Sequence, residues 1–347
     1  MDSVSYSELH QQVSPDIDAE IAAALDLLGP SADAVRKAVD KLLRHQQMKH
    51  PLSVLPLLVH AAETGRTGPA VPLSALHLLW WTSACYLDDL ADGQSGGAAE
   101  RLDMNEAVLA SVITGNVLPV RLIQSQDVPE PVRSALIAEL TEASIMGAEG
   151  QLADMRGEAG RATRKGVLEV YRGKSGGPFA MITAMAAILS GTTTERIALW
   201  REFGQVFGLL WQMFNDQEDV ASGRNEDLAN GTVTYLLACA LEDAAPEARA
   251  HILDLCAAAR ISAPARSKLT ALLLAPPVLD GFREDVSTYR DEADRILGEL
   301  GGDERYLPAL RQLVDLSAQI LLQPDPRWLP PTLYGNEEES RHDRHSG

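Results

Sequence analysis

Residues 84–93 read ACYLDDLADG and follow the apolar run ALHLLWW. On a helix Asp88 and Asp92 lie on one face, because residues four apart are neighbours, and Asp89 lies on the flank. Carboxylates so close together repel one another, so they either face water or bind a cation. Since the turns before them are strongly apolar, we expect a helix at 71–92 that carries its carboxylates to the rim of an apolar space.

A second acidic stretch, FNDQEDVASGRNED, ends a helical pattern expected at 193–220. Asn215 and Asp219 share a face there, as do Asp216 and Asp219. Oxygen ligands without His or Cys suit a hard cation, and Mg²⁺ is commonly shared between one or two carboxylates and substrate phosphate. Either stretch alone is more typical of a solvated helix end than of a metal site. Two of them after aromatic-rich helices predict Mg²⁺ and a diphosphate above a hydrocarbon cavity.

Composition narrows the class of protein. The chain has 347 residues, of which 46% are hydrophobic, and a formal net charge of −19. This charge excludes nucleic acid and an anionic membrane surface as main partners, because both would be repelled. The cysteines Cys85, Cys239 and Cys256 form neither a disulfide framework nor a zinc pattern. No signal peptide or bilayer-spanning run is recognisable, so we expect a cytoplasmic protein without a membrane span.

The pattern is helical almost throughout. Ala and Leu dominate, β-branched runs are scarce, and the connections are short and rich in Pro or Gly. We predict one all-α domain at 15–322, a flexible N-terminus at 1–14 and a disordered tail at 323–347. Besides the two acidic helices, helices are expected at 16–28, 32–46, 104–124, 130–156, 176–190, 232–242, 246–259, 265–275, 283–300 and 305–322.

Five elements in chain order make the sequence resemble the trans-isoprenyl diphosphate synthase (polyprenyl synthetase) family. The resemblance implies the class I terpenoid synthase fold, an all-α bundle around a central hydrophobic cavity. It also implies a prenyl diphosphate substrate, roughly three Mg²⁺ ions per active site and a homodimer. The elements are Asp88-Asp89-Leu90-Ala91-Asp92, Gly150-Gln151-Leu152-Ala153-Asp154, Lys174-Ser175, Trp211-Gln212-Met213-Phe214-Asn215-Asp216-Gln217-Glu218-Asp219, and Asp227-Leu228 with Gly231.

The resemblance assigns roles to these residues. Lys174 and Arg172 would grip the diphosphate as it becomes negative, and Asp227 would lie near the substrate. Gln151 and Gln212 would hydrogen-bond near the head group, or equally serve as interhelical hydrogen bonds. The loop at 221–231 is our candidate for a lid. The residues assigned to Mg²⁺ are Asp88, Asp89, Asp92, Asn215, Asp216 and Asp219, of which Asp88, Asp92, Asn215 and Asp219, together with Lys174, are also the expected catalytic residues.

Residues on the expected cavity helices bear on substrate length. Trp81, Phe179 and Trp211 would line the cavity and stabilise a carbocation with their ring faces, unless they are ordinary core. The small residues Ser83 and Ala84 stand about one turn before the first acidic motif, so the cavity would extend toward Trp80 or Trp81. This favours a C20 chain over a C15 chain, unless Ser83 serves only helix packing.

The match fails where a second diphosphate, held without metal, needs basic residues. Ser53 and Leu55 stand where the family has basic residues, Thr232 stands for a lysine, and the first motif is followed by no arginine pair. A diphosphate dianion in a site without cations would lose its hydration, and no positive charge would compensate for that cost. We therefore expect the isopentenyl diphosphate site to be lost.

Three hypotheses follow. The first is a class I terpene synthase, a cyclase that converts a linear prenyl diphosphate, geranylgeranyl diphosphate by preference, into a cyclic terpene. Asn215 fits it, because such cyclases commonly begin their second metal motif with Asn. The alternative is a short-chain prenyltransferase of geranylgeranyl or farnesyl diphosphate synthase type, with second-site cations from Arg44, Lys49 or Arg66. The third, a non-catalytic modulating subunit, is disfavoured by the intact aspartates.

Overall fold

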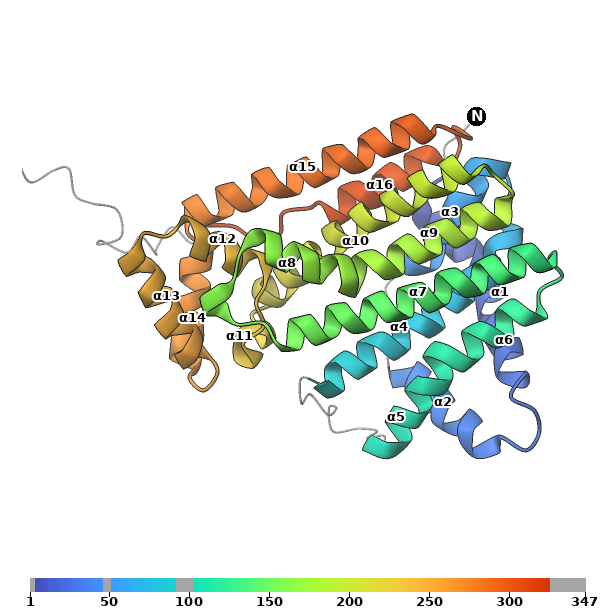
Figure 1. Cartoon of the computed structure of the whole chain (residues 1–347), viewed down its shortest axis with the longest axis horizontal. Helices are drawn as coiled ribbons and strands as arrows, with labels where there is room; N and C mark the ends of the chain where they lie inside the picture. Colours follow the sequence, from blue (N-terminus) through green and yellow to red (C-terminus); the bar gives the residue numbers. More distant parts are fainter. Residues whose placement is uncertain (1–3, 46–50, 92–102, 325–347) are drawn as a thin grey trace, which may run out of the picture. The chain divides into compact units, whose positions relative to one another are not determined.

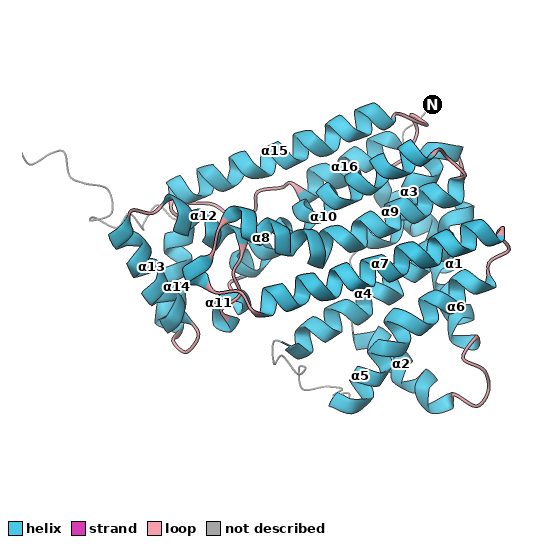
Figure 2. Cartoon of the chain, in the orientation of Figure 1, coloured by secondary structure: helices cyan, strands magenta, loops and turns pink. Residues whose placement is uncertain are grey.

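A computed structural model describes residues 4–45, 51–91 and 103–324. Within these residues every regular element is a helix and no strand occurs, as Figures 1 and 2 show. The prediction of an all-α fold is confirmed. The α-helices are α1 (Tyr6–Asp26), α2 (Asp33–His45), α3 (Pro51–Thr64), α4 (Val71–Ala91), α5 (Met104–Val112), α6 (Leu118–Ser125), α7 (Glu130–Met155), α8 (Arg164–Tyr171), α9 (Gly177–Ser190), α10 (Thr194–Ser222), α11 (Glu226–Asn230), α12 (Tyr235–Asp243), α13 (Pro246–Ala259), α14 (Ala263–Leu273), α15 (Pro276–Leu300) and α16 (Leu307–Ser317).

Four short segments complete the helical elements of the described chain. Two are 3₁₀-helices, η1 (Gly68–Ala70) and η3 (Ala159–Arg161). The other two are π-helical turns, η2 (Ile113–Val117) and η4 (Arg172–Gly176). A π-helical turn inserted in a helical run often marks a functional site, and η4 contains the predicted site residues Arg172 and Lys174.

The chain forms two compact units. The boundary falls inside α10, so the second acidic motif begins with Asn215 at the end of one unit and continues with Asp216 in the other. A single domain at 15–322 was expected from the sequence, which contains no break in composition at these points. Unit 1 comprises Met1–Arg156, Leu168–Asn215 and Val286–Gln319, and unit 2 comprises Gly157–Val167, Asp216–Asp285 and Ile320–Gly347.

Unit 1 contains a buried helix that the sequence pattern does not predict. α3 packs against α4 and α9, and all residues at 53–62 are buried. A helix that is apolar on every side has no polar face, so its sequence shows no amphipathic period. Pro56 inside the helix further disguises it, because proline usually interrupts a helix.

Glycines allow three elements of unit 1 to approach closely. A Cβ atom on Gly150 of α7 would lie 2.3 Å from the backbone nitrogen of Lys174 and 2.7 Å from the carbonyl carbon of Gly173, both in η4. A Cβ atom on Gly208 of α10 would lie 2.7 Å from the Gly176 Cα, at the end of η4. Only glycine fits at such distances. The position of η4 is therefore set by backbone contacts to both α7 and α10.

Arg164, at the start of α8, ties together separate segments of unit 2. Its guanidinium donates hydrogen bonds of 2.5 and 3.1 Å to the two carboxylate oxygens of Asp243 and lies 3.4 Å from Asp285. Tyr235 donates a further hydrogen bond of 3.0 Å to Asp285. The planar fork of arginine suits this two-pronged pairing with a carboxylate. The segment at 157–167 is thereby fixed to α12 and to the first part of α15.

Helix boundaries differ from the expected ones in several places. α1 begins at Tyr6, inside the segment expected to be flexible, because Leu9, Val13 and Ile17 form a buried stripe at four-residue spacing. The helix expected at 104–124 is divided by η2 into α5 and α6. The short helices α8 and α11 were not expected, since neither contains two full repeats of an amphipathic pattern.

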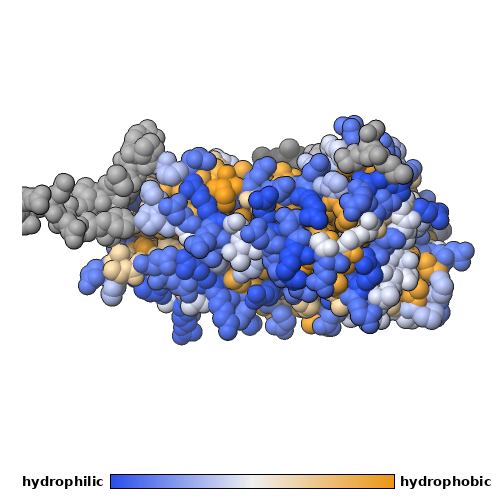
Figure 3. Space-filling model, turned by 90° about the horizontal axis from the view of Figure 1, so that it is seen from above, coloured by the Kyte–Doolittle hydropathy of each residue, from blue (hydrophilic) through white to orange (hydrophobic). Residues whose placement is uncertain are grey.

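The surface agrees with the high net charge. The face shown in Figure 3 is largely hydrophilic, with hydrophobic side chains in separate patches. One helical stretch, Met104–Ser125, is long and apolar enough to cross a membrane, with a mean hydropathy of 1.4. Half of that window is buried inside the protein. Core helices pass the same test, so this stretch is only a weak indication of a membrane span.

Candidate functional site

The first acidic motif meets a lysine in unit 1. The Lys174 Nζ lies 2.7 Å from the Asp154 Oδ2 and 3.2 Å from the Asp88 carboxylate. The Gln151 side-chain amide donates a hydrogen bond of 2.6 Å to the Asp88 Oδ1. The side chains of Lys174 and Asp154 are only 19% and 11% exposed, so their charges are largely withdrawn from solvent. We call these four residues the Lys174 cluster.

Three elements position the Lys174 cluster. Asp88 lies near the end of α4, Gln151 and Asp154 lie on the last turns of α7, and Lys174 lies in η4. Residues three apart on a helix point to the same side, which places Gln151 and Asp154 together. The close approach of Gly150 to η4 brings the lysine backbone directly against α7. The glycine of the GQxxD element and the lysine of the next element therefore belong to one arrangement.

The electrostatics of the Lys174 cluster leave it with excess negative charge. Burial alone would lower the pKa of Lys174, but the charges of Asp88 and Asp154 and their hydrogen bonds raise it well above its ordinary value. Lys174 therefore stays protonated at neutral pH, and one ammonium group faces two carboxylates. An anionic ligand would compete with the carboxylates for the ammonium, and a divalent cation would neutralise the remaining carboxylate charge.

The predicted aromatic lining residues lie together in unit 1. The fully buried Phe179 ring of α9 lies 5.0 Å from Trp81 of α4 and 6.0 Å from Trp211 of α10, measured between ring centroids. Phe207 and His77 contact the Phe179 ring as well, at 5.0 and 5.6 Å. Such edge-on and tilted geometries are the preferred ones for aromatic pairs. The three predicted residues, Trp81, Phe179 and Trp211, therefore form one cluster with Phe179 at its centre.

The remaining predicted residues of unit 1 have separate surroundings. Ser83 donates a hydrogen bond of 2.8 Å to the Ser111 carbonyl oxygen of α5, which is the helix-packing alternative. The Gln212 Oε1 accepts a hydrogen bond of 2.5 Å from the Ser175 hydroxyl, an interhelical contact. Arg172 is exposed at the start of η4, and Ala84 is half-buried on α4.

The second acidic motif is arranged differently. Asp219 is 4% exposed, and its two carboxylate oxygens accept hydrogen bonds from the backbone N–H groups of Glu226 and Asp227, at 3.0 and 3.2 Å. The Arg224 Nε lies 3.9 Å from the same carboxylate. Asp216 is also buried, at 8% exposure, while Asn215 is half-buried at the end of unit 1. Asp219 thus contacts main chain, where Asp88 contacts side chains.

The donor set is compatible with Mg²⁺. Among the described residues, no three His, Cys, Asp or Glu side chains lie close enough to form a ready-made metal site. Asp92, predicted as a ligand, lies outside those residues. Mg²⁺ usually takes one or two carboxylates and completes its shell with water and substrate phosphate, so it needs no preformed cage. The half-buried carboxylates of Asp88 and Asp89 at the end of α4 fit that requirement.

One member of the Lys174 cluster is absent from the predicted site residues. Asp154 makes the shortest contact with the lysine, at 2.7 Å. The signal for it was present, because it is the last residue of the GQxxD element and lies three residues after Gln151 on the same helix face.

Known proteins resemble this chain in sequence and in fold. The polyprenyl synthetase family model matches residues 98–270. The chain belongs to the polyprenyl synthetase family. A curated relative, the short chain isoprenyl diphosphate synthase of Methanothermobacter thermautotrophicus, is 27% identical over 216 residues. That match covers 58% of this chain and 65% of the relative, just under two thirds of its length.

Solved structures of several prenyl diphosphate synthases share the fold of this chain. A geranylgeranyl pyrophosphate synthetase from Pyrococcus horikoshii Ot3 matches with a TM-score of 0.77 and 17% identity, over 91% of this chain and 99% of that one. A decaprenyl diphosphate synthase from Rhodobacter capsulatus matches with a TM-score of 0.77 and 19% identity, over 90% of this chain and 98% of that one. A polyprenyl synthase from Caulobacter crescentus CB15, complexed with calcium and isoprenyl diphosphate, matches with a TM-score of 0.76 and 17% identity. This match covers 92% of this chain and 98% of that one. The predicted fold and family resemblance are confirmed.

This polyprenyl synthetase family member departs from the family pattern at core positions. Ser53 and Leu55, which stand where basic residues are expected, are 3% and 0% exposed on α3. Arg44, one proposed replacement cation, lies 3.6 Å from Asp40 on its own helix. Lys49, another proposed replacement cation, lies outside the described residues.

Proposed function

We propose that this protein is an isoprenyl diphosphate synthase that ionises an allylic prenyl diphosphate and joins the resulting cation to isopentenyl diphosphate. The observation that carries the proposal is the Lys174 cluster, a largely buried ammonium group shared by two carboxylates, in the unit that also contains the packed aromatic cluster. The activities named for its relatives support the same assignment. This is the prenyltransferase alternative of the sequence analysis, which the comparisons favour over the cyclase.

The residues of unit 1 divide the work of ionisation. Lys174 would exchange part of its pairing with Asp88 and Asp154 for the diphosphate oxygens, in charge-assisted hydrogen bonds. Asp88 and Asp89 would hold Mg²⁺, which supplies Lewis-acid stabilisation of the departing diphosphate when bound. Gln151 would keep the Asp88 carboxylate oriented through its 2.6 Å hydrogen bond. Asn215, Asp216 and Asp92 remain proposed ligands from the resemblance.

The hydrocarbon part of the substrate would enter the aromatic interior of unit 1. Trp81, Phe179 and Trp211 would exclude water from the carbocation and offer it ring faces. We retain the proposal of a C20 chain. Since Ser83 makes a helix-packing contact with α5, Ala84 is the residue on which this proposal depends.

The terpene cyclase is the second candidate, and a specific observation favours it. Ser53 and Leu55 are buried neutral residues, so they supply no charge for a second diphosphate. Without isopentenyl diphosphate, the nearest nucleophile for the cation is a double bond of the same chain. The cyclase and the prenyltransferase would share the Lys174 cluster and differ only in what attacks the carbocation.

One experiment separates the two candidates. The purified protein is incubated with Mg²⁺ and C10, C15 or C20 prenyl diphosphate, each with and without isopentenyl diphosphate. We expect longer diphosphates that form only when isopentenyl diphosphate is present, detected by liquid chromatography and mass spectrometry. A cyclic terpene formed without it would replace the proposed reaction by cyclisation. No turnover of any substrate would favour the non-catalytic subunit.

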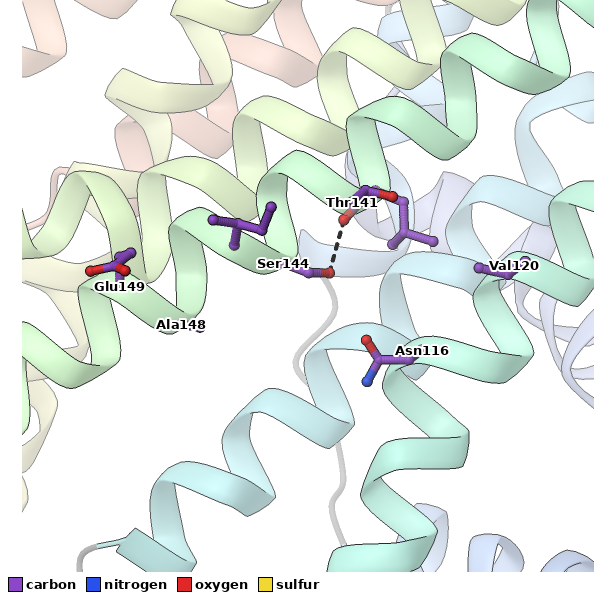
Figure 4. A pocket seen from close by; sticks show the side chains of 8 residues that line it. Asn116, Val120, Thr141, Ser144, Ala148 and Glu149 are labelled. Carbon is purple, nitrogen blue, oxygen red and sulfur yellow. Dashed lines mark hydrogen bonds between the residues drawn. The ribbon is translucent and has the colours of Figure 1, made fainter.

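We also propose a homodimer, formed through α5, η2 and α7. These elements carry most of the large exposed apolar side chains among the described residues, including Leu109 at 67%, Met104 at 63% and Ile145 at 56% exposed. Exposed apolar clusters on soluble proteins commonly mark interaction sites. A groove of about 400 Å³ lies between η2–α6 and α7 beside this face. Figure 4 shows the residues that line it, among them Asn116, Val120, Thr141, Ser144, Ala148 and Glu149.

The proposed dimer face is tested by introducing charge at its centre. Leu109→Asp and Ile145→Asp should each shift the protein from dimer to monomer in multi-angle light scattering. Ile261→Asp is the matched control, because Ile261 is 91% exposed in unit 2, away from these helices in the sequence. A wild-type protein that is monomeric at all concentrations would refute the dimer.

A further inference from the structure

Asp219 is fully engaged by the segment that follows it. Its Oδ1 accepts a hydrogen bond from Glu226 N at 3.0 Å and its Oδ2 accepts one from Asp227 N at 3.2 Å. Its carbonyl oxygen accepts from Asn225 N at 3.3 Å and from the Ser222 hydroxyl at 3.1 Å. The carboxylate therefore satisfies two first-turn N–H groups of α11, as the side chain of a helix cap does. Asp219 plays this role from outside α11.

The connection from α10 to α11 is tightly constrained. Asn225 has φ 52° and ψ 40°, and among the described residues no other non-glycine residue has a positive φ. The Thr270 hydroxyl of α14 donates a hydrogen bond of 2.9 Å to the Asn225 Oδ1, and the Asn225 Nδ2 donates one of 3.0 Å to the Gly223 carbonyl oxygen. A non-glycine residue persists in this backbone region only where its surroundings enforce it. Here Asp219 and Thr270 both do so.

We propose that Asp219 is a positioning residue that fixes the 223–227 loop and the first turn of α11, and that it is not a metal ligand. Glu226 and Asp227 are half-buried. If Asp219 turned to a metal ion, their N–H groups would lose their acceptor, and an unsatisfied buried donor is costly. This cost favours the observed contact over coordination.

The anchored loop carries a cation. The Arg224 guanidinium is 54% exposed and lies 3.6 Å from Glu226 as well as 3.9 Å from Asp219. Its Nε donates a hydrogen bond of 3.2 Å to the Ser222 hydroxyl. If the loop were released from Asp219, the Arg224 guanidinium would therefore no longer be held in one position. The consequence for catalysis rests on the proposed function, in which the anionic substrate is a prenyl diphosphate.

Hydrogen exchange tests the anchor without reference to any substrate. Amide exchange in the 220–232 peptide is followed by mass spectrometry for the wild type, Asp219→Asn and Asp216→Asn, in the absence of Mg²⁺. We expect exchange of the Glu226 and Asp227 amides to become about ten- to a hundredfold faster in Asp219→Asn, since a charged acceptor is lost. Asp216→Asn, another buried aspartate of the same helix end, should leave it unchanged. Equal exchange in the wild type and Asp219→Asn would overturn the proposal.

Kinetics separate a positioning residue from a metal ligand. For Asp219→Asn we expect KM for the prenyl diphosphate to rise about tenfold, with kcat and the half-saturating Mg²⁺ concentration each within about threefold of the wild type. A half-saturating Mg²⁺ concentration raised more than tenfold would make Asp219 a ligand and overturn the proposal. If the wild type turns over no prenyl diphosphate, the proposed function fails. The exchange measurement then decides alone whether Asp219 anchors the loop.

Discussion

The two acidic motifs look equivalent in the sequence and are used differently in the structure. In unit 1, Asp88 pairs with the side chains of Lys174 and Gln151, each from another element. In unit 2, Asp219 pairs with main-chain N–H groups of the segment that follows it. Side-chain partners can move to a ligand at small cost, whereas main-chain partners can be released only by moving the loop. The first arrangement is suited to exchange with a ligand, and the second to holding structure.

Removal of Asp88 should have the largest effect on the reaction. Asp88→Ala takes away a proposed Mg²⁺ ligand and one neighbour of Lys174, so kcat/KM should fall about a thousandfold. The fold should persist, because Lys174 keeps Asp154 at 2.7 Å. Steady-state kinetics and circular dichroism measure the two effects. Asp280→Ala is the control, since that side chain is 70% exposed and should leave both unchanged. An active Asp88→Ala protein would mean that the two motifs do not differ in the proposed way.

Removal of Lys174 should affect both activity and stability. Lys174→Ala leaves Asp88 and Asp154 facing each other without a cation, so the free energy of unfolding should fall by about 2 kcal/mol or more. The loss of the proposed diphosphate partner should lower kcat/KM about a hundredfold. Chemical denaturation and steady-state kinetics report the two separately. Lys37→Ala is the control, because Lys37 forms a surface ion pair with Asp33 and is 75% exposed.

A Lys174→Ala protein that is stable but inactive would sharpen the comparison, because it would show that the lysine is held for the ligand. One that is destabilised yet fully active would contradict it. The Lys174 cluster would then be a structural ion pair, like the Asp219 contacts.

Most of the fold was predictable because most helices are amphipathic. The stripe in α10 and the capped starts of α12 and α14 are visible in the sequence. α3 was not, because burial on every side removes the period that reveals a helix and Pro56 interrupts the apolar run. The π-helical turns η2 and η4 were not predictable either. They depend on contacts such as that of Gly150 with η4, between residues far apart in the chain.

The candidate site was predictable in composition more than in arrangement. Helix spacing led to Asp88 and the family resemblance to Gln151 and Lys174, and the structure brings these three residues together. The sequence analysis assigned Asp219 to Mg²⁺ together with Asp88, because helix spacing says nothing about main-chain partners. The contact of Asp219 with α11 depends on the left-handed conformation of Asn225, which an asparagine in a sequence suggests only weakly.

Glu63 shows how a purely structural carboxylate of unit 1 should behave. Its side chain is 7% exposed and accepts hydrogen bonds from Arg196, from the Trp200 Nε1 at 2.6 Å and from the Thr192 hydroxyl at 2.9 Å. Burial would raise the pKa of Glu63, but these hydrogen bonds and the Arg196 charge lower it below its ordinary value. Glu63→Gln should therefore cost about 3 kcal/mol of stability at neutral pH, without a direct effect on KM.

The pH dependence of this cost has a definite sign. Because the pKa of Glu63 is lowered in the folded protein, its stabilisation is complete above the unfolded pKa of about 4.3. It is lost as the pH falls through the folded pKa. The difference in unfolding free energy between wild type and Glu63→Gln should be constant above about pH 5 and shrink below about pH 4. A difference that stays constant down to pH 3, in urea titrations, would contradict the lowered pKa.

The smallest expected effect tests whether the backbone sets the Lys174 cluster. In Gly150→Ala the new methyl group would lie 2.3 Å from the backbone nitrogen of Lys174, so α7 and η4 must separate. We expect a loss of about 1–3 kcal/mol from overpacking, which outweighs the helix preference of alanine, about 1 kcal/mol. Gly298→Ala is the matched control, because Gly298 also lies in a helix, α15, with nothing within 4 Å of its added Cβ. That substitution should instead stabilise the protein by about 0.5–1 kcal/mol.

Urea denaturation of the Gly150→Ala and Gly298→Ala variants gives stability changes of opposite sign if the contact is as close as described. Gly150→Ala should also lower kcat/KM, because displacement of η4 moves the ammonium group away from Asp88 and Asp154. Equal stabilisation by both alanines would mean that α7 and η4 tolerate a methyl group between them. The lysine would then be placed by its ion pairs alone, and unit 1 would lack the backbone constraint that the 223–227 loop of unit 2 has.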